Sequence, residues 1–228
     1  MASGLDYRAM RWFIFNGDDP LTTDHPDQRK IASTNTNIVD SPGQYFLYDK
    51  YHPQLLGMIL ERATGMTVTD YTQMQLWDPL GMGYDGAWAL DSAASGFEKM
   101  EAGLNARAID YAKFGRLFLE GGVWDGLQMV SSRWVEESTS LDATTHTPEY
   151  YAESFGPGVY DGGAGYYRYM WYGRQRNDRQ PDFSAAGDHG QFIHVSAANS
   201  VIIVRSATNY GIPFKEWVDV LYDAADRL

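Results

Sequence analysis

The sequence predicts an α+β fold in which helices come first and antiparallel strands, covered by a last helix, come second. Two observations support this prediction. Apolar residues recur at helical spacing between residues 53 and 120, and glycines stand where each helix should end. After Tyr150 the composition changes to glycine, tyrosine and tryptophan, and short β-branched or alternating runs follow one another.

The helical part begins after about forty polar, turn-rich residues that leave room for one short helix. Pro53 suits the first turn of a helix that stops at Gly65, and a second helix follows from a capping box formed by Thr67 and Asp70 to Pro79. Further helices are expected over Arg107–Glu120 and Ser132–Ser138. The predicted inward residues are Leu55, Leu56, Ile59 and Leu60 in the first helix, and Ile109, Ala112, Leu117 and Phe118 in the third.

The strand part shows three candidate strands, over Tyr166–Tyr172, Gln191–Val195 and Val201–Arg205. Residues 196–200 are short enough for a hairpin, and residues 174–181 are expected to form a charged surface loop. The chain closes with a helix from Pro213 that should bury Trp217, Val220, Leu221 and Ala224. We therefore expect a mostly helical lobe at residues 1–149, followed at 150–228 by the strands and helix of an α/β lobe.

Composition excludes several classes of protein. With 44% hydrophobic residues in 228, the chain can form a buried core, and its net charge of −12 repels a nucleic-acid backbone. No apolar run is long enough to span a membrane, and the first residues do not form a secretory signal. Zero cysteine leaves the compartment open.

Common catalytic motifs are absent from the sequence. It has no Gly-x-Ser-x-Gly elbow, no phosphate-binding loop and no His-Glu-x-x-His zinc pair. His189 and His194 are five residues apart on a predicted strand, so their side chains should point to opposite faces and cannot share a metal. We expect His194 to be structural, and His25, His52 and His146 to be surface residues.

A set of spaced motifs carries the functional signal. Residues 42–50 (PGQYFLYDK) precede 54–65 (QLLGMILERATG) and 79–82 (PLGM), and 103–107 (GLNAR), 110–115 (DYAKFG) and 121–126 (GGVWDG) follow. Residues 187–191 (GDHGQ) open one strand, and 201–205 (VIIVR) form the next. Together these segments resemble the serine β-lactamase-related, penicillin-binding-like hydrolases, especially the class C-like branch with 6-aminohexanoate-dimer hydrolases and esterases. The resemblance implies a β-lactamase/transpeptidase-like fold.

The resemblance also implies a mechanism. In that family a serine and a lysine in Ser-x-x-K are one helical turn apart, and a tyrosine in Tyr-x-Asn helps to move the serine proton. Tyr48 matches the catalytic tyrosine, with a buried structural aromatic as its alternative. Lys50 stands in the place of the Asn, where it can donate but not accept a hydrogen bond. A cation at Lys50 would lower the pKa of Tyr48.

The Lys-Thr-Gly place of the family is occupied by Asp188-His189-Gly190. The resemblance implies that Gly190 admits substrate close to the backbone and that the amide of Gln191 is an oxyanion donor. His189 either touches substrate or holds the strand edge. Asp188 in place of a cation argues against recognition of a β-lactam carboxylate. No metal or organic cofactor is implied.

The nucleophile is missing from these residues. The residues three positions before the five lysines (Lys30, Lys50, Lys99, Lys113 and Lys215) are Asp27, Leu47, Gly96, Asp110 and Ile212, so no Ser-x-x-K is present. Ser3 matches a turn that follows the nucleophile helix. We therefore expect an N-terminally truncated hydrolase that is inactive alone, with a periplasmic or secreted parent.

Two functional classes stay open. One is a serine hydrolase of small amides or esters. The other is a non-catalytic fragment, or a binding module whose missing segment comes from a partner chain. In either case, exposed strand edges would favour a partner or self-association.

Overall fold

The structure, a computed structural model, describes residues 1–6, 25–34, 36–48, 50–151, 161–176 and 179–228. The described chain divides into two compact units, Met1–Ala106 and Arg107–Leu228, and each is considered by itself. The predicted change of lobe at 149/150 falls inside the second unit. The reason is that helices α6 (Ala108–Leu119) and α7 (Ser132–Thr139) pack against strands of that unit.

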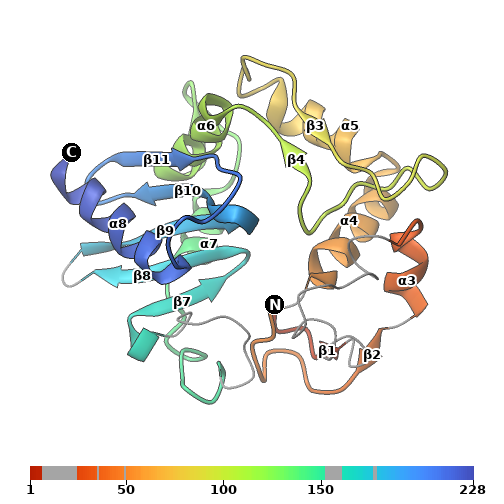
Figure 1. Cartoon of the computed structure of the whole chain (residues 1–228), viewed down its shortest axis with the longest axis horizontal. Coiled ribbons are helices and arrows are strands. Elements are labelled where there is room, and N and C mark those ends of the chain that lie inside the picture. The colour runs from red at the N-terminus through yellow and green to blue at the C-terminus, as the bar shows by residue number, and fades with distance from the viewer. Residues whose placement is uncertain (7–24, 35, 49, 152–160, 177–178) are drawn as a thin grey trace. The chain divides into compact units, whose positions relative to one another are not determined.

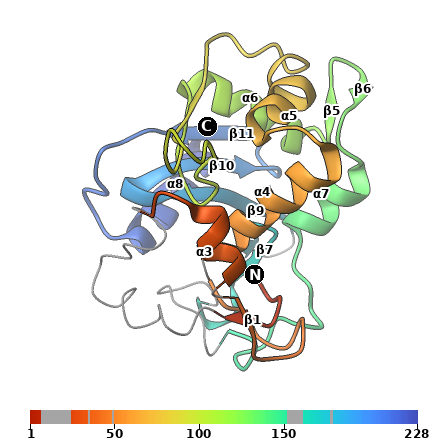
Figure 2. The ribbon, with the colours of Figure 1, turned by 90° about the vertical axis from the view of Figure 1, so that its right-hand side faces the viewer.

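The first unit is arranged around helix α4 (Tyr51–Thr64), with α3 (Gln28–Thr34) packed beside it (Figures 1 and 2). Helix α4 ends as predicted at Gly65, which takes a left-handed φ of 71° and donates its N–H to the carbonyl of Glu61 at 2.8 Å. The other elements of this unit are β1 (Leu5–Asp6), β2 (Asn37–Ile38), α5 (Val68–Thr72), the π-helical turn η1 (Gln73–Trp77), β3 (Ala87–Trp88) and β4 (Leu104–Asn105).

The face that α4 buries differs from the predicted stripe. Leu56 and Ile59 are 54% and 62% exposed, so their prediction as inward residues is wrong in this unit. The buried face instead carries Gln54 and Gly57. Gly57 explains the difference, because a Cβ there would lie 2.7 Å from Cγ of Met100. The missing side chain lets the segment after β3 pack directly on the helix backbone.

Helix α5 begins where the sequence predicts. The hydroxyl of Thr67 accepts a hydrogen bond from the backbone N–H of Asp70 at 3.0 Å, which satisfies one of the free donors of the first turn. The helix then continues into η1. No helix in the described part of the chain is long and apolar enough to cross a membrane.

The second unit contains a five-stranded antiparallel sheet in the order β11-β10-β9-β8-β7, in which each strand pairs with its neighbour in sequence (Figure 1). Such a sheet forms from successive hairpins. The strands are β7 (Gly165–Arg168), β8 (Trp171–Arg176), β9 (Arg179–Gly187), β10 (Gln191–Ser196) and β11 (Val201–Arg205). The unit also holds the hairpin β5 (Val123–Trp124) and β6 (Leu127–Gln128), the short turns η2 (Asp161–Gly163) and η3 (Asp188–Gly190), and helix α8 (Phe214–Arg227).

Two sequence predictions about the sheet are wrong. The run from Tyr166 to Tyr172 is not one strand, because Tyr169 and Met170 both take positive φ (45° and 74°) and form the two-residue turn between β7 and β8. The expected loop at residues 174–181 largely belongs to strands β8 and β9. The charged residues of this segment indicated a surface loop rather than strands. The aspartate that follows it, at position 182, is nevertheless buried in the sheet.

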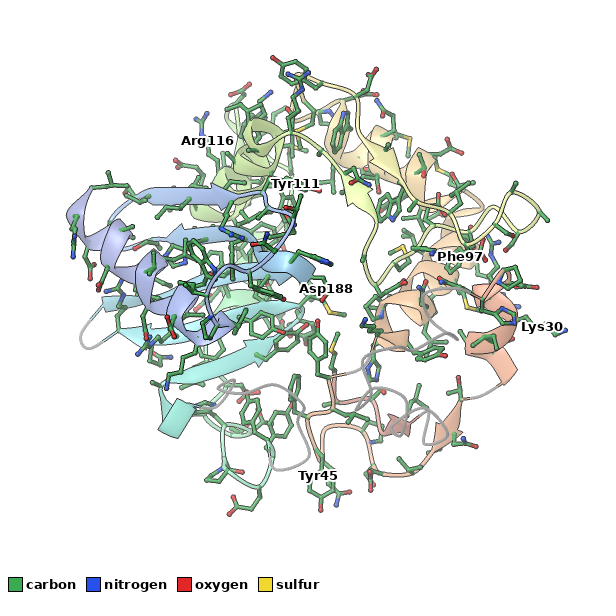
Figure 3. The ribbon with its side chains drawn as sticks, viewed as in Figure 1. Lys30, Tyr45, Phe97, Tyr111, Arg116 and Asp188 are labelled. Carbon is green, nitrogen blue, oxygen red and sulfur yellow. The ribbon has the colours of Figure 1, made fainter. Side chains whose placement is uncertain are left out.

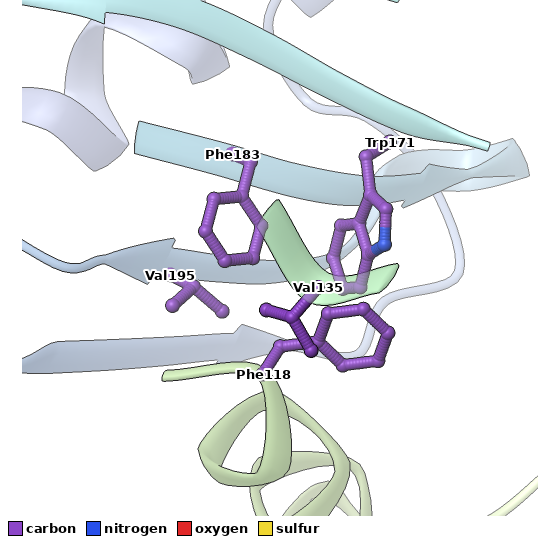
Figure 4. Close-up of a cluster of buried hydrophobic side chains, with 5 residues drawn as sticks. All are labelled: Phe118, Val135, Trp171, Phe183 and Val195. Carbon is purple, nitrogen blue, oxygen red and sulfur yellow. The ribbon is translucent and has the colours of Figure 1, made fainter. Parts of the chain in front are cut away.

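Helices cover both faces of this sheet. Phe183 and Val195 point to the α6 and α7 side, where they cluster with Phe118, Val135 and Trp171 (Figure 4). Alternate residues on the same strands point to the α8 side, where Phe192 stacks on Phe214 with ring centroids 5.7 Å apart. This alternation buries β9 and β10 on both faces.

The two covering helices bury partly different residues from those predicted. In α6 the prediction is confirmed for Leu117 and Phe118, but Ile109 is 56% exposed. In α8, Leu221 is buried as predicted whereas Val220 is 45% exposed. The buried face of α8 is completed by Tyr222 and Ala225. The buried face of α8 differs from the predicted one because Tyr222 packs on His194, with ring centroids 5.1 Å apart.

Candidate functional site

Tyr48 lies in the first unit, in an extended segment that leads directly into α4. The N-terminal residues hold this segment: the N–H of Leu47 donates to the carbonyl of Met1 at 2.9 Å, and the N–H of Gly43 donates to that of Ala2 at 2.7 Å. Tyr48 is half-buried. Its position just before α4 constrains its backbone, while the residue stays partly accessible.

Lys50 is the N-cap residue of α4, with helical backbone angles (φ −66°, ψ −18°), and its side chain makes no capping hydrogen bond. Glu101 is close enough for its carboxyl to respond to this cation. Burial raises the pKa of Glu101, and the positive charges of Lys99 and Lys50 partly offset that rise. The expected effect of Lys50 on the pKa of Tyr48 stays a prediction.

A buried amide network behind Lys50 was not predicted from the sequence. Gln54, one turn after Lys50, donates from Nε2 to Oε1 of Gln28 at 2.6 Å and to the carboxylate of Glu101. Its Oε1 accepts the backbone N–H of Met100 at 3.3 Å. Both glutamines are buried. Gln54, on the inward face of α4, could have indicated a buried polar network. It was overlooked because the residues that follow it are apolar.

His52 corrects another expectation. It is buried rather than on the surface, and its Nε2 lies 2.6 Å from Oγ of Ser3. The same Oγ accepts the backbone N–H of Leu5 at 3.1 Å. The pair therefore ties the turn at residues 1–4 to the first turn of α4. Ser3 is engaged in this contact, and its assignment to a turn rather than to the nucleophile stays a prediction.

Asp188, His189 and Gly190 lie in the second unit, where they form the tight turn η3 between β9 and β10. Figure 3 shows Asp188 where β9 ends. The prediction that His189 lies on a strand is wrong, because its φ is 63° and the strand begins only at Gln191. Asp188 and His189 are exposed, and Gly190 is buried with φ 80°. The turn thus presents two side chains and holds its glycine inside.

The side chain of Gln191 is occupied. Its Oε1 accepts the backbone N–H of Ala207 at 3.0 Å, and its Nε2 donates to the carbonyl of the same residue. This paired contact joins the start of β10 to the segment after β11. The side-chain amide is therefore committed to structure, and in the sheet Gln191 pairs with Gly187 of β9.

His194 has the structural place expected for it. It is fully buried on β10, and its Nδ1 lies 2.9 Å from Oγ of Ser184 on β9. Burial lowers the pKa of His194 to about 4, and the positive charge of Arg176 adds to this while the nearby carboxylate of Asp182 opposes it. A neutral, enclosed imidazole cannot reach a substrate.

The remaining candidates are also structural. Tyr166, Tyr167 and Trp171 are buried, so most of the aromatic run from Tyr166 to Tyr172 belongs to the core. His146 is half-buried, with Nε2 3.0 Å from the carbonyl of Gly163. Among the residues that the structure describes, no group of three or more His, Cys, Asp or Glu side chains could hold a metal ion.

A cavity of about 740 Å³ in the first unit lies away from the predicted site residues. Helices α3 and α4 line it, and Arg29 joins them through a two-point contact with the carboxylate of Glu61, at 2.6 and 3.0 Å. The same guanidinium donates to the carbonyl of Ser95 at 3.0 Å and lies over the ring of Phe97. Arg29 and Glu61 therefore neutralise each other in this cavity.

In the second unit, three of the predicted site residues (Asp188, His189 and Gly190) form one turn, and the fourth, Gln191, begins the strand that follows it. Tyr48 and Lys50 lie together at the start of α4 in the first unit. A half-buried tyrosine beside a helix start, and a glycine turn at the end of a strand, are the kinds of group that acyl-transfer sites use for proton transfer and carbonyl binding.

Comparison with known proteins identifies the fold. The fold is that of β-lactamases and penicillin-binding proteins. It is similar to a protein assigned as a 6-aminohexanoate-dimer hydrolase from Bacillus anthracis, with a TM-score of 0.70 and 21% identity, over 85% of this chain and 47% of that one. It is also similar to a penicillin-binding protein from Bacillus halodurans, with a TM-score of 0.60 and 16% identity, over 98% of this chain and 69% of that one.

Comparison of the sequence assigns the chain to a family. The profile of the family described as Beta-lactamase matches residues 1–216, so the chain belongs to the beta-lactamase family. A 6-aminohexanoate-dimer hydrolase from Paenarthrobacter ureafaciens is 29% identical over 162 residues, which are 70% of this chain and 38% of that protein. The chain therefore spans well under half the length of this curated relative.

Proposed function

We propose that this chain supplies the tyrosine and the acyl-pocket turn of a serine hydrolase that cleaves a small amide or ester. A serine oxygen adds to the substrate carbonyl, and its proton passes by way of Tyr48 to the leaving amine or alcohol. Water then hydrolyses the acyl-enzyme, which returns the serine and releases the acid. The oxyanion formed in each step is stabilised from the Gly190–Gln191 side of the site.

The observation that carries this proposal is the family match over residues 1–216, which includes both Tyr48 and the turn at 188–190. The similarity to a 6-aminohexanoate-dimer hydrolase supports an amide as substrate. Asp188 stands where a cation would bind the carboxylate of a β-lactam, so an antibiotic is disfavoured. The net charge of −12 favours neutral or cationic substrates.

The proposal places the attacking serine outside these 228 residues. Since no lysine in the sequence has a serine three residues before it, the Ser-x-x-K pair must come from another segment or chain. The alternative function is a non-catalytic binding module of the same fold. The absence of Ser-x-x-K is the specific observation that favours it.

A partner is part of the proposal. β7 and β11 are the outer strands of the sheet, and β11 is the apolar run Val201–Val204 followed by Arg205. An outer strand of this composition favours pairing with another strand. Sedimentation of the purified chain should show self-association or, with the complementing segment added, a defined complex; a dilute monomer in both cases would contradict this part.

The test uses a fluorophosphonate probe and p-nitrophenyl butyrate. The chain alone should show neither labelling nor hydrolysis, and adding the Ser-x-x-K-bearing segment of the Paenarthrobacter relative should produce both. In the complemented protein, Tyr48→Phe should lower kcat by about a hundredfold or more. The matched control is Tyr45→Phe, an exposed tyrosine of the same extended segment, which should keep activity.

Three outcomes separate the alternatives. Labelling of a serine in the chain by itself would overturn the placement of the nucleophile. Failure of every complemented protein to react, with the complex formed, would favour the binding module. Equal activity of the Tyr48→Phe and Tyr45→Phe variants would remove Tyr48 from the mechanism.

A further inference from the structure

Two contacts with the first residues of the chain stand on either side of Tyr48. Before it, the backbone N–H of Leu47 donates to the carbonyl of Met1 at 2.9 Å. After it, in the first turn of α4, Nε2 of His52 lies 2.6 Å from Oγ of Ser3. Met1 and Ser3 are only two residues apart. One short stretch of chain therefore holds the segment of the tyrosine at both ends.

That stretch, the N-terminal turn at residues 1–4, is fixed to other parts of the first unit. The backbone N–H groups of Val39 and Asp40 donate to the carbonyl of Gly4, at 2.9 and 3.3 Å. A Cβ at Gly4 would lie 2.1 Å from the carbonyl oxygen of Asp40, so the two backbones are in contact. Strands β1 and β2 pair directly after the turn. The N-terminal turn is therefore a support for the Tyr48 segment and does not depend on that segment alone for its place.

The hydroxyl of Ser3 links this turn to α4. Its Oγ accepts the backbone N–H of Leu5 at 3.1 Å, which fixes the direction of the side chain. A hydroxyl has one hydrogen to donate and two lone pairs that accept, so the same oxygen can also bond to Nε2 of His52. His52 is buried, and an alanine at position 3 would remove the hydroxyl from its Nε2. This hydroxyl is therefore the part of the turn that reaches the helix.

The path of the backbone between the two contacts decides where the hydroxyl of Tyr48 lies. The residue is half-buried, so the core does not enclose it completely. A tyrosine side chain has only two torsion angles with few preferred values, and the place of its hydroxyl therefore follows from the place of its backbone. A shift of the first turn of α4 away from the N-terminal turn would carry the Tyr48 hydroxyl with it.

We propose that Ser3 is a positioning residue for Tyr48, acting through its contact with His52. This inference rests on the proposed function, in which Tyr48 passes on the proton of the attacking serine. Proton transfer requires the tyrosine hydroxyl to lie within hydrogen-bond reach of both partners, and a displacement of about 1 Å can cost about a hundredfold in rate. Ser3 itself touches no reacting atom in this arrangement.

The experiment compares Ser3→Ala and Ser3→Thr in the ¹⁵N-labelled chain. Ser3→Ala should shift the Tyr48 amide signal and speed hydrogen exchange of the Leu47 amide about tenfold, because the segment is then held at one end only. Ser3→Thr keeps the hydroxyl and should leave both unchanged. The matched control is Thr67→Ala, which removes a hydroxyl hydrogen bond from the same unit at the start of α5 and should also leave both unchanged.

An unchanged Leu47 amide in a folded Ser3→Ala protein overturns the proposal, and so does an equal effect of Thr67→Ala. If Ser3→Ala does not fold, the unmutated chain decides. The ¹⁵N order parameter of the Tyr48 amide should then be about 0.85, as expected for the amides of α4, and a value below about 0.6 contradicts a held segment.

Kinetics of the complemented hydrolase separate positioning from simple stability. Ser3→Ala should lower kcat about tenfold with KM unchanged, Ser3→Thr should restore most of the loss, and Thr67→Ala should keep full activity. An unchanged kcat in Ser3→Ala overturns the proposal, as does fluorophosphonate labelling of Ser3 itself, which would make it a reacting group. If no complemented protein hydrolyses ester, the proposed function fails, while the amide measurements still decide whether Ser3 holds the Tyr48 segment.

Discussion

His194 and Asp182 lie on adjacent strands of the sheet, with Nε2 and Oδ2 3.7 Å apart and both side chains fully buried. Ser184 completes a serine–histidine–aspartate arrangement of the kind that hydrolases use. The cluster is enclosed by α8, and the ring of Tyr222 lies against the imidazole. Burial therefore makes this cluster a structural element, and its measurable consequence is in stability rather than catalysis.

Stability should depend on the protonation of His194. Its pKa is about 4 in the folded chain and about 6.5 when unfolded, so the unfolded chain binds a proton first as the pH falls. The free energy of unfolding should be highest above pH 6.5 and fall between pH 6.5 and 4, by up to about 3 kcal/mol. Urea unfolding across this range measures the slope.

The His194→Gln variant provides the control, since glutamine can still bond to Ser184 but does not titrate. It should lose most of this slope, whereas His25→Gln in the first unit should retain it. Equal slopes in the unmutated and His194→Gln proteins would show that the histidine does not titrate in this window.

A second prediction concerns the buried carboxylate of Asp182. Arg176 donates to its Oδ2 from Nε at 3.0 Å and from Nη2 at 2.5 Å. Removal of the cation leaves a fully buried charge without its ion-pair partner, so Arg176→Met should destabilise the chain by about 3 kcal/mol in urea unfolding. Adding Asp182→Asn to this variant should recover part of the loss.

The matched control is the pair of Arg174 with Asp219, which lie 2.7 Å apart, against 2.5 Å for Arg176 and Asp182, and whose side chains are more exposed. Exposed pairs contribute little, so Arg174→Met should cost less than about 1 kcal/mol. A loss as large as that of Arg176→Met would mean that burial of the partner does not determine the effect.

The sequence predicted those parts of the fold that depend on local signals. The side chain of Thr67 caps the start of α5, and Gly65 ends α4 with a left-handed backbone conformation. The structure confirms both predictions. Strand β9 was missed, because its aspartate and serine at 182 and 184 are stabilised only by contacts with distant residues such as Arg176 and His194.

The same limit applies to the candidate site. Tyr48 and Gly190 were proposed as site residues from motif spacing, which the local sequence preserves. The contact of Arg205 with the Gly190 carbonyl was not predicted, because Arg205 lies fifteen residues after Gly190, at the end of another strand. The sequence indicates for Arg205 only the end of an apolar β run. Its contact with the turn depends on the register of β10 and β11, which pairs Phe192 with Arg205.

A third prediction concerns Thr67, the N-cap residue of α5. Thr67→Ala removes the acceptor for the Asp70 N–H and should cost about 1 kcal/mol. Thr67→Ser keeps the hydroxyl and should stay close to the unmutated chain. Thermal unfolding of the three proteins gives the comparison, and an equal loss for alanine and serine would assign the effect to the methyl group of Thr67 instead of the cap.

The last prediction concerns the close contact between Gly173 and Tyr166, which face each other across β7 and β8. A Cβ at Gly173 would lie 2.0 Å from Cζ of the Tyr166 ring, and that ring is buried with its hydroxyl bonded to the carbonyl of Thr139. The ring cannot move aside without breaking this bond, so Gly173→Ala should destabilise the chain by about 2 kcal/mol through overpacking. Gly187→Ala on β9 is the matched control, because its nearest neighbour, Cβ of Gln191, would be at an ordinary 3.4 Å. Urea unfolding should separate the two variants clearly, and equal stability would mean that the Tyr166 ring yields at little cost.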